Sequence, residues 1–149
     1  MNNYTIIHET DFQRARKKIR EAVNSGKSVI FTSNSDDLNR KILEKEQINV
    51  LLLNLARRKD KQKQRDSGFN QVLAKIARKK NVSVGINMDE ILNSKSKEKA
   101  EILSRVRQNI KLCNKNKLKM SFFPELKDKY DIKALGLVLG MPTWMTKNI

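Results

Sequence analysis

The stretch INVLLLNLA, residues 48–56, decides the fold. Its apolar side chains follow one another with little polar alternation, so a strand built from it is buried on both faces. Burial on both faces is typical of a parallel sheet that is covered by helices. This segment therefore predicts an α/β fold.

The sequence on either side of this stretch alternates between strand and helix patterns. Strands are expected over residues 4–9, 28–33, 48–56, 81–88 and 118–124, and helices over residues 11–26, 35–45, 69–80, 94–117 and 131–141. About five strand–helix units in strict alternation predict parallel strands joined by right-handed crossovers. Periodicity alone leaves open whether the sheet is a barrel or a doubly wound open sheet. No linker rich in proline, glycine or serine divides the chain, so we interpret residues 1–149 as a single domain.

Two helices have further expected features. Asp66 or Ser67 is well placed to cap the helix over residues 69–80. In the long helix over residues 94–117, helical spacing predicts that the inward residues are Ala100, Leu103, Val106, Ile110 and Cys113.

The composition indicates a polyanionic partner. The chain has 32 lysine and arginine residues against 16 aspartate and glutamate residues, which gives a formal net charge of +16. Such an excess repels itself in the compact state, and binding a polyanion lowers this cost. Nucleic acid is the leading candidate because neutralised phosphates release counterions. The alternatives are a surface kept soluble by its charge and an anionic membrane surface.

The sequence offers no sign of export or of a membrane span. It lacks a run of about 18 apolar residues, and its first residues lack the basic and apolar segments of a secretory signal. The single cysteine, Cys113, cannot form an internal disulfide. We therefore expect a cytoplasmic location, with Cys113 as a small core residue.

The densest positive charge directly follows the apolar strand. Residues 57–65, here called the basic loop, carry six cations: Arg57, Arg58, Lys59, Lys61, Lys63 and Arg65. Loops that follow the strands of such folds form the functional face, and the N-terminus of the next helix adds to the anion-binding potential. Arg40, Lys127 and Lys129 are expected at the same rim. We predict that these nine residues bind RNA, whereas the basic residues of the helix over 69–80 form a solvated face.

The side chains that an enzyme would need are mostly missing. The sequence has no glycine-rich phosphate loop, and its one histidine, His8, is remote from Cys113. Asp89 and Glu90 could hold Mg²⁺ at a strand end, but Asp89 is better explained as the cap of the turn DEILN, residues 89–93. We therefore expect no catalytic residue and no metal site. Because aromatic residues are few, recognition should depend on the charge and shape of a structured RNA.

Four segments, in the same order, resemble ribonuclease P protein component 3, the thirty-kilodalton-class subunit of archaea and eukaryotes. These segments are DDLNRKILEKEQINVLLLN (36–54), DSGFNQVLAKIARKKNVSVGIN (66–87), EILSRVRQNIKLCNKNKLKMSF (101–122) and YDIKALGLVLGM (130–141). The resemblance covers about residues 28–141. Each motif alone has little specificity, but four in the correct order are fairly specific.

The resemblance implies a fold and a function. The family fold is a TIM-type barrel, and its members are subunits of the ribonucleoprotein that removes the 5′ leader from precursor tRNA. There the RNA is the catalyst and uses Mg²⁺, so the protein is expected to bind no cofactor and to carry no catalytic side chain. Its expected partners are the ribonuclease P RNA, precursor tRNA indirectly, and a small ferredoxin-like subunit in a heterotetramer. Arg40 matches the family's Asn-Arg arginine, and Arg58 with Lys59 or Arg65 takes the place of its basic loop.

The sequence also departs from the family pattern. A full barrel needs roughly 200 residues or more, so we expect a reduced barrel of five or six parallel strands, open on one side. The family's Ser-Ser-Ala and Arg-Gly-Pro loop is replaced by SFFPELKDKYD, residues 121–131, where Lys127 and Lys129 offer point charges instead of the arginine fork. Gln71 stands where relatives often have histidine.

Two other functions remain open from the sequence. One is a small α/β enzyme that acts on a phosphorylated small molecule and uses the basic rim as a substrate clamp. The other is a structural scaffold with no role in processing, whose exposed sheet edge is covered by a partner protein.

Overall fold

The computed structural model describes residues 3–125 and 128–149 of the chain. Its single described sheet has five parallel strands: β1 (Tyr4–His8), β2 (Ser28–Thr32), β3 (Val50–Leu53), β4 (Ser83–Asn87) and β5 (Met120–Phe123). The strands lie side by side in the order β1-β2-β3-β4-β5, so each strand pairs with its neighbour in the sequence. A doubly wound sheet reverses its strand order at a switch point, whereas a barrel does not. The order therefore resolves the question that periodicity leaves open and confirms a reduced TIM-like arrangement.

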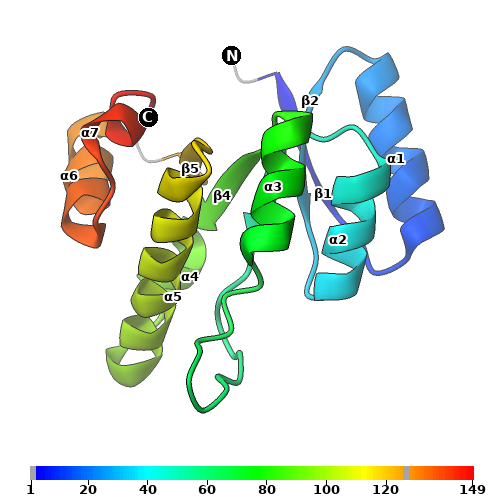
Figure 1. The fold of residues 1–149 in the computed structure, drawn as a ribbon. Coiled ribbons are helices and arrows are strands. Elements are labelled where there is room, and N and C mark those ends of the chain that lie inside the picture. Colours follow the sequence, from blue (N-terminus) through cyan, green and yellow to red (C-terminus); the bar gives the residue numbers. More distant parts are fainter. Residues whose placement is uncertain (1–2, 126–127) are drawn as a thin grey trace.

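The helices follow the strands, with two additions to the expected pattern. The described helices are α1 (Phe12–Asn24), α2 (Asp36–Lys45), α3 (Gln71–Lys80), α4 (Met88–Asn93), α5 (Ser96–Lys115), α6 (Lys129–Leu139) and α7 (Thr143–Thr146). The short helices α4 and α7 are new, and the strand expected over residues 48–56 is only four residues long. Figure 1 shows the larger helices flanking the sheet and the long connection from β3 to α3 extending away from it.

One local prediction is wrong and another is confirmed only in part. The cap of α3 is Asn70, whose side chain accepts a hydrogen bond from the backbone N–H of Leu73 at 2.9 Å, so neither Asp66 nor Ser67 has this role. In α5 the buried face includes Ile102 and Arg105, while Ala100 is exposed and Leu103 only half-buried. Val106, Ile110 and Cys113 are buried as predicted, but the buried face also includes Arg105, which was not expected there.

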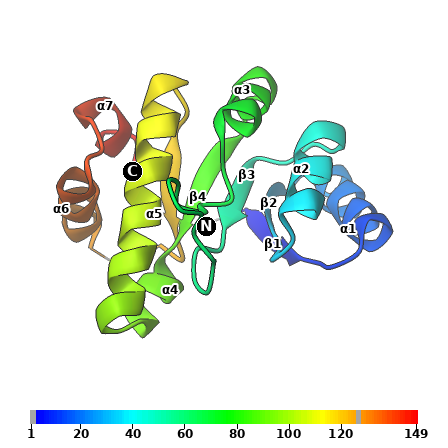
Figure 2. The same cartoon turned by 60° about the horizontal axis from the view of Figure 1, so that its bottom comes forward.

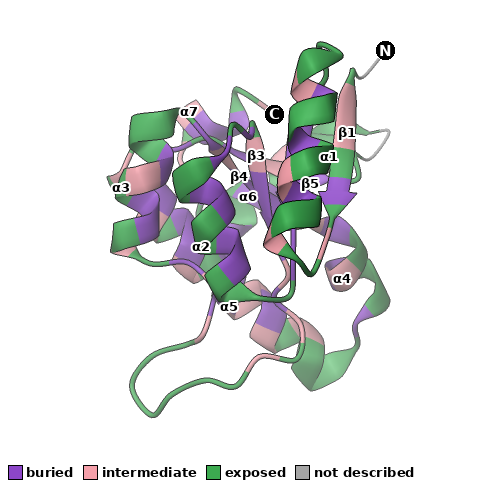
Figure 3. Cartoon of the chain, turned by 90° about the vertical axis from the view of Figure 1, so that its right-hand side faces the viewer, coloured by how far each residue is buried: buried purple, intermediate pink, exposed green. Residues whose placement is uncertain are grey.

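The main hydrophobic core lies between the sheet and its helices. Alternate strand residues such as Phe31, Leu51 and Val84 pack there with Ile42, Ile110 and other helix residues. Cys113 is fully buried in this core, as predicted. Figure 3 shows buried residues on the inner sides of α2 and α3 and exposed residues on their outer sides. Among the described residues, no helix has the length and apolar character needed to cross a bilayer.

The opposite face of the sheet curls around a second, smaller cluster. Ile30, Leu52 and Phe123 are buried there without any helix residue in the cluster, and Tyr4 packs against them. The rings of Tyr4 on β1 and Phe123 on β5 meet edge to face with 6.0 Å between their centroids. These are the two edge strands of the sheet, so their contact requires the sheet to be strongly curved. The sheet is therefore curved like part of a barrel wall, although β1 and β5 are not hydrogen-bonded to each other.

On this concave face, Gly85 of β4 has no side chain, so Leu52 of β3 can pack closely against it. A Cβ atom at Gly85 would lie 2.9 Å from Cδ1 of Leu52 and 3.2 Å from its backbone Cα. We predict that Gly85→Ala lowers the free energy of unfolding by about 1–3 kcal/mol, because the backbone of β3 cannot move away without disturbing its ladder. Denaturant titration measures this change. Ser83→Ala, at a half-buried position of the same strand, is the control and should have little effect, and equal stability of the two variants would contradict the close packing.

Candidate nucleic-acid interface

Polar side chains join the carboxyl ends of the three central strands. The Asn54 side chain, just after β3, donates to Oγ1 of Thr32 and to Oδ1 of Asn34, each at 3.1 Å. Its own Oδ1 accepts from Asn87 at 2.9 Å. Because these residues come from the ends of β2, β3 and β4, the network fixes the rim from which the basic loop leaves the sheet.

Arg58 anchors the start of the basic loop rather than pointing into solvent. Its two terminal nitrogens pair with both carboxylate oxygens of Asp36 at 2.9 and 3.0 Å, and one of them also contacts Asp66 at 3.2 Å. Its Nε donates to the Asn54 carbonyl at 2.7 Å. Burial alone would lower the pKa of Arg58, but the hydrogen bonds and charges of Asp36 and Asp66 raise it above its ordinary value. The side chain is only 10% exposed, so Arg58 holds the loop, and its contact with RNA stays a prediction.

A buried arginine on α5 also holds this segment in place, through hydrogen bonds and an ion pair. Arg105 is 2% exposed and donates to the carbonyl oxygens of Leu55 and Arg58, each at 2.9 Å. It also pairs with Asp60 at 3.2 Å. The planar guanidinium can bind several acceptors in one fixed geometry. It therefore ties the chain just before the loop, and one backbone position and one carboxylate within it, to α5.

Asp60 organises the tip of the loop. Its Oδ1 accepts from the backbone N–H of Asp66 at 2.7 Å, and its Oδ2 lies 3.6 Å from Arg65. The hydrogen bond from Asp66, followed by the contacts with Arg105 and Arg65, lowers the pKa of Asp60 below its usual range. Between Asp60 and Arg65, the backbones of Lys61 and Gln64 exchange hydrogen bonds of 2.9 and 3.3 Å in a tight turn. The loop is thus a folded hairpin-like projection.

The predicted RNA-binding cations fall into three groups. The first group lies in the basic loop, where four exposed side chains have no ion pair among the described residues: Arg57, Lys59, Lys61 and Lys63. Arg65 is half-exposed beside Asp60, and Arg40 pairs with Glu44 at 2.8 Å, yet Arg40, Lys61 and Arg65 line one shallow cleft. Lys129 begins α6, and α5 lies between α6 and the loop in both views (Figures 1 and 2). The structure therefore brings Arg40 to the basic loop but keeps Lys129 apart, and Lys127 lies outside the described residues.

Near the rim, Asn87 and Glu90 form hydrogen bonds that stabilise the fold. Asn87 caps α4 by accepting from the N–H of Glu90 at 3.3 Å, so the prediction that Asp89 is this cap is wrong. Glu90 accepts from the backbone N–H groups of Leu55 and Ala56 at 2.7 and 3.2 Å, and burial raises its pKa. The described part of the chain contains no group of three or more histidine, cysteine, aspartate or glutamate residues that could hold a metal ion. Burial also raises the pKa of Cys113 to about 12, so its thiol is protonated at neutral pH.

Comparison with known proteins places this architecture in a family. The sequence profile described as RNase P subunit p30 matches residues 6–149. The chain belongs to the RNase P subunit p30 family. Ribonuclease P protein component 3 of Methanococcus maripaludis strain S2 is 26% identical over 134 residues, which are 89% of this chain and 53% of the relative. That of Methanococcus vannielii is 28% identical over 137 residues, which are 89% and 54% of the two chains. The chain thus spans about half the length of the curated relatives it matches.

A solved structure shares the fold of this p30-family chain. It is described as the cryo-EM structure of archaeal ribonuclease P with mature tRNA, and the superposition has a TM-score of 0.77 at 23% sequence identity. The match covers 95% of this chain and 62% of the other. This likeness confirms the expected fold class, with five parallel strands alternating with helices.

Sequence reasoning missed how α5 of this p30-family member holds the loop. Besides Arg105, Gln108 donates to the Arg65 carbonyl at 3.0 Å, and Asn109 donates to the Ser67 carbonyl at 3.3 Å. These three polar residues share the side of α5 that faces the loop. Their signal was present in the sequence, because Ile102, Arg105 and Asn109 follow helical spacing, but an arginine in such a stripe is normally interpreted as solvated.

We predict that Arg105→Met loosens the loop. The change leaves the Leu55 and Arg58 carbonyls without their donor, which should lower the free energy of unfolding by about 1–3 kcal/mol. Hydrogen–deuterium exchange should become faster over residues 55–67, and Arg105→Lys should not restore protection because it lacks the guanidinium fork. Arg107→Met, at an exposed position of the same helix, is the control. Loop exchange that is equal in both methionine variants would contradict the role given to Arg105.

Proposed function

We propose that this chain is a protein subunit of ribonuclease P that binds the catalytic RNA and stabilises its fold for removal of the 5′ leader from precursor tRNA. The RNA supplies the catalysis with Mg²⁺, and the protein supplies positive charge. The observation that carries the proposal is the braced loop, in which Arg58 and Arg105 hold the backbone while four other cations face solvent. Because the loop is already ordered, RNA binding need not bear the entropic cost of ordering it.

A protein partner is part of the proposal. Helix α6 exposes three apolar side chains, with Tyr130 83%, Leu137 52% and Val138 71% exposed. They share one side of the helix, and such a surface is typical of a protein contact. We infer that a small ferredoxin-like subunit binds the chain and that the two form a heterotetramer, so that the apolar side of α6 is covered in the assembled particle.

We predict that changing Arg57, Lys59, Lys61 and Lys63 to alanine weakens RNA binding without unfolding the protein. Their side chains face solvent, so the change removes cations that neutralise phosphate and leaves the anchors Arg58 and Arg105 in place. The slope of log affinity against log salt should fall by about 0.9 for each phosphate of a duplex region that the variant no longer neutralises. Filter binding to a ribonuclease P RNA over a salt series measures this slope, and cleavage of precursor tRNA at low Mg²⁺ measures the effect on processing.

The matched control changes four exposed lysines away from the loop, Lys17, Lys27, Lys79 and Lys119, to alanine. Both variants lose four positive charges, so a difference between them reports location and not net charge. The proposal expects a much smaller change of slope in the control. Equal slopes in the two variants, or unchanged precursor cleavage in the loop variant, would count against it.

A further inference from the structure

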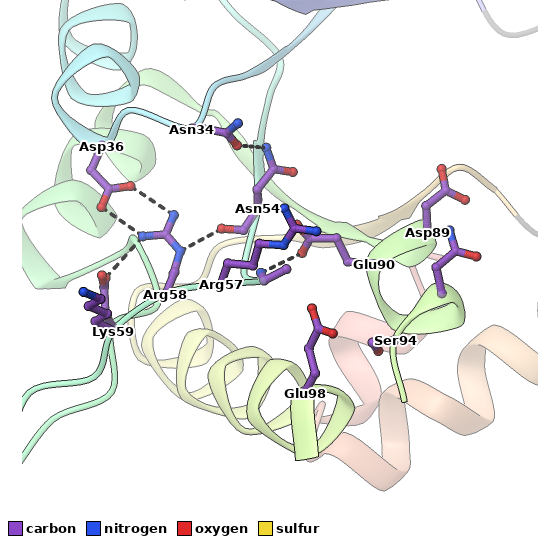
Figure 4. A pocket seen from close by; sticks show the side chains of 13 residues that line it. Asn34, Asp36, Asn54, Arg57, Arg58, Lys59, Asp89, Glu90, Ser94 and Glu98 are labelled. Carbon is purple, nitrogen blue, oxygen red and sulfur yellow. Dashed lines mark hydrogen bonds and ion pairs between the residues drawn. The ribbon is translucent and has the colours of Figure 1, made fainter. Parts of the chain in front are cut away.

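A cleft lies beside the basic loop on the same rim. It has a volume of about 750 Å³ and is bounded by the start of the loop, by Asn34 and Asn54 after β2 and β3, and by α4 with the first turn of α5 (Figure 4). This volume falls within the range of about 300–1,000 Å³ that is typical of small-ligand sites. The cleft is therefore large enough for a single nucleotide.

The two sides of the cleft carry opposite charge. Arg57 and Lys59 line it from the loop, while Asp89 and Glu98 line it from α4 and α5 (Figure 4). Among the described residues these four have no ion pair or side-chain hydrogen bond with the protein. The other charged groups of the cleft are engaged, since Arg58 pairs with Asp36 and Asp66 and Glu90 accepts from two backbone N–H groups. The free groups are thus two cations on one side and two carboxylates on the other.

This arrangement suits a ligand with an anion at one end and N–H donors at the other. Ionised carboxylates only accept hydrogen bonds, so Asp89 and Glu98 attract amino groups and repel phosphate. Arg57 and Lys59 do the reverse. The lining has five carboxylates against three cations although the whole chain carries a net charge of +16. An RNA backbone therefore gains little from entering the cleft, whereas a base can enter while its phosphate stays at the loop.

We propose that the cleft binds one unpaired nucleotide of a structured RNA, with its phosphate at Arg57 and Lys59 and the base facing Asp89 and Glu98. Proteins read unpaired bases in this way, through hydrogen bonds to their exposed edges. Carboxylates accept from exocyclic amino groups such as N4 of cytosine. Adenine, cytosine and guanine carry such a group, whereas the single donor of uracil, N3–H, lies between two carbonyl oxygens that the carboxylates repel. The site therefore prefers amino-bearing bases over uracil, and this preference rests on the RNA-binding function proposed above.

The test is to titrate the chain at low salt with AMP, CMP, GMP, UMP and inorganic phosphate, and to measure each affinity from the NMR chemical shifts. The three amino-bearing nucleotides should bind at least fivefold more tightly than UMP. In Asp89→Asn with Glu98→Gln the preference should shrink to within twofold, while binding of UMP and phosphate becomes tighter because negative charge is removed. Glu21→Gln with Asp131→Asn is the control, since it removes two exposed carboxylates outside the cleft and should keep the preference.

Two results would overturn the nucleotide site. One is equal binding of the four nucleotides, which would make the cleft a simple anion site, and the other is a preference that survives in Asp89→Asn with Glu98→Gln. Either result can occur while the loop variant still weakens binding of the structured RNA, in which case the proposed function stands. Absence of the loop effect itself would overturn the proposed function and the nucleotide site with it.

Discussion

The six cations of the basic loop repel one another, and the contacts around the loop must oppose this repulsion. Six cations within nine residues favour an extended, mobile segment, and ordering a loop costs about 1–2 kcal/mol for each residue fixed. The buried guanidinium of Arg105 opposes this cost by binding the Leu55 carbonyl just before the loop and the Arg58 carbonyl and Asp60 within it. Arg58 acts similarly from within the loop, through Asp36 and Asp66. Arg58 and Arg105 thus hold in place the segment that carries the exposed cations.

The curved sheet determines the position of the basic loop. Because its five strands are parallel and follow sequence order, each loop after a strand leaves from the same rim. The edge-to-face contact of Tyr4 with Phe123 shows how strongly the sheet curls, and the Asn54 network joins its central strand ends. Curvature brings the start of α2, the basic loop and α4 around one cleft. The barrel-like geometry of the p30 family therefore serves here to gather charged groups from distant parts of the sequence.

The sequence was sufficient for the features that depend on local pattern. The apolar run around β3 predicted a parallel α/β fold, and the charge of residues 57–65 predicted an exposed basic loop after a strand. It was insufficient where pairing spans the chain. Arg58 and Asp36 are 22 residues apart, and Arg105 and Leu55 are 50 apart, so their contacts depend on the curvature of the sheet and on the rotation of α5. Lys129 was misplaced for the same reason, because sequence order says that it follows β5 but not that α5 separates it from the loop.

Lysine reactivity, measured with and without folded ribonuclease P RNA, shows whether the RNA covers the basic loop. Brief acetylation followed by mass spectrometry reports which amines the RNA covers. We expect strong protection of Lys59, Lys61 and Lys63, with Lys27, Lys79 and Lys119 remaining reactive. Uniform protection of all six, or protection of the second group alone, would contradict a binding surface centred on the braced loop.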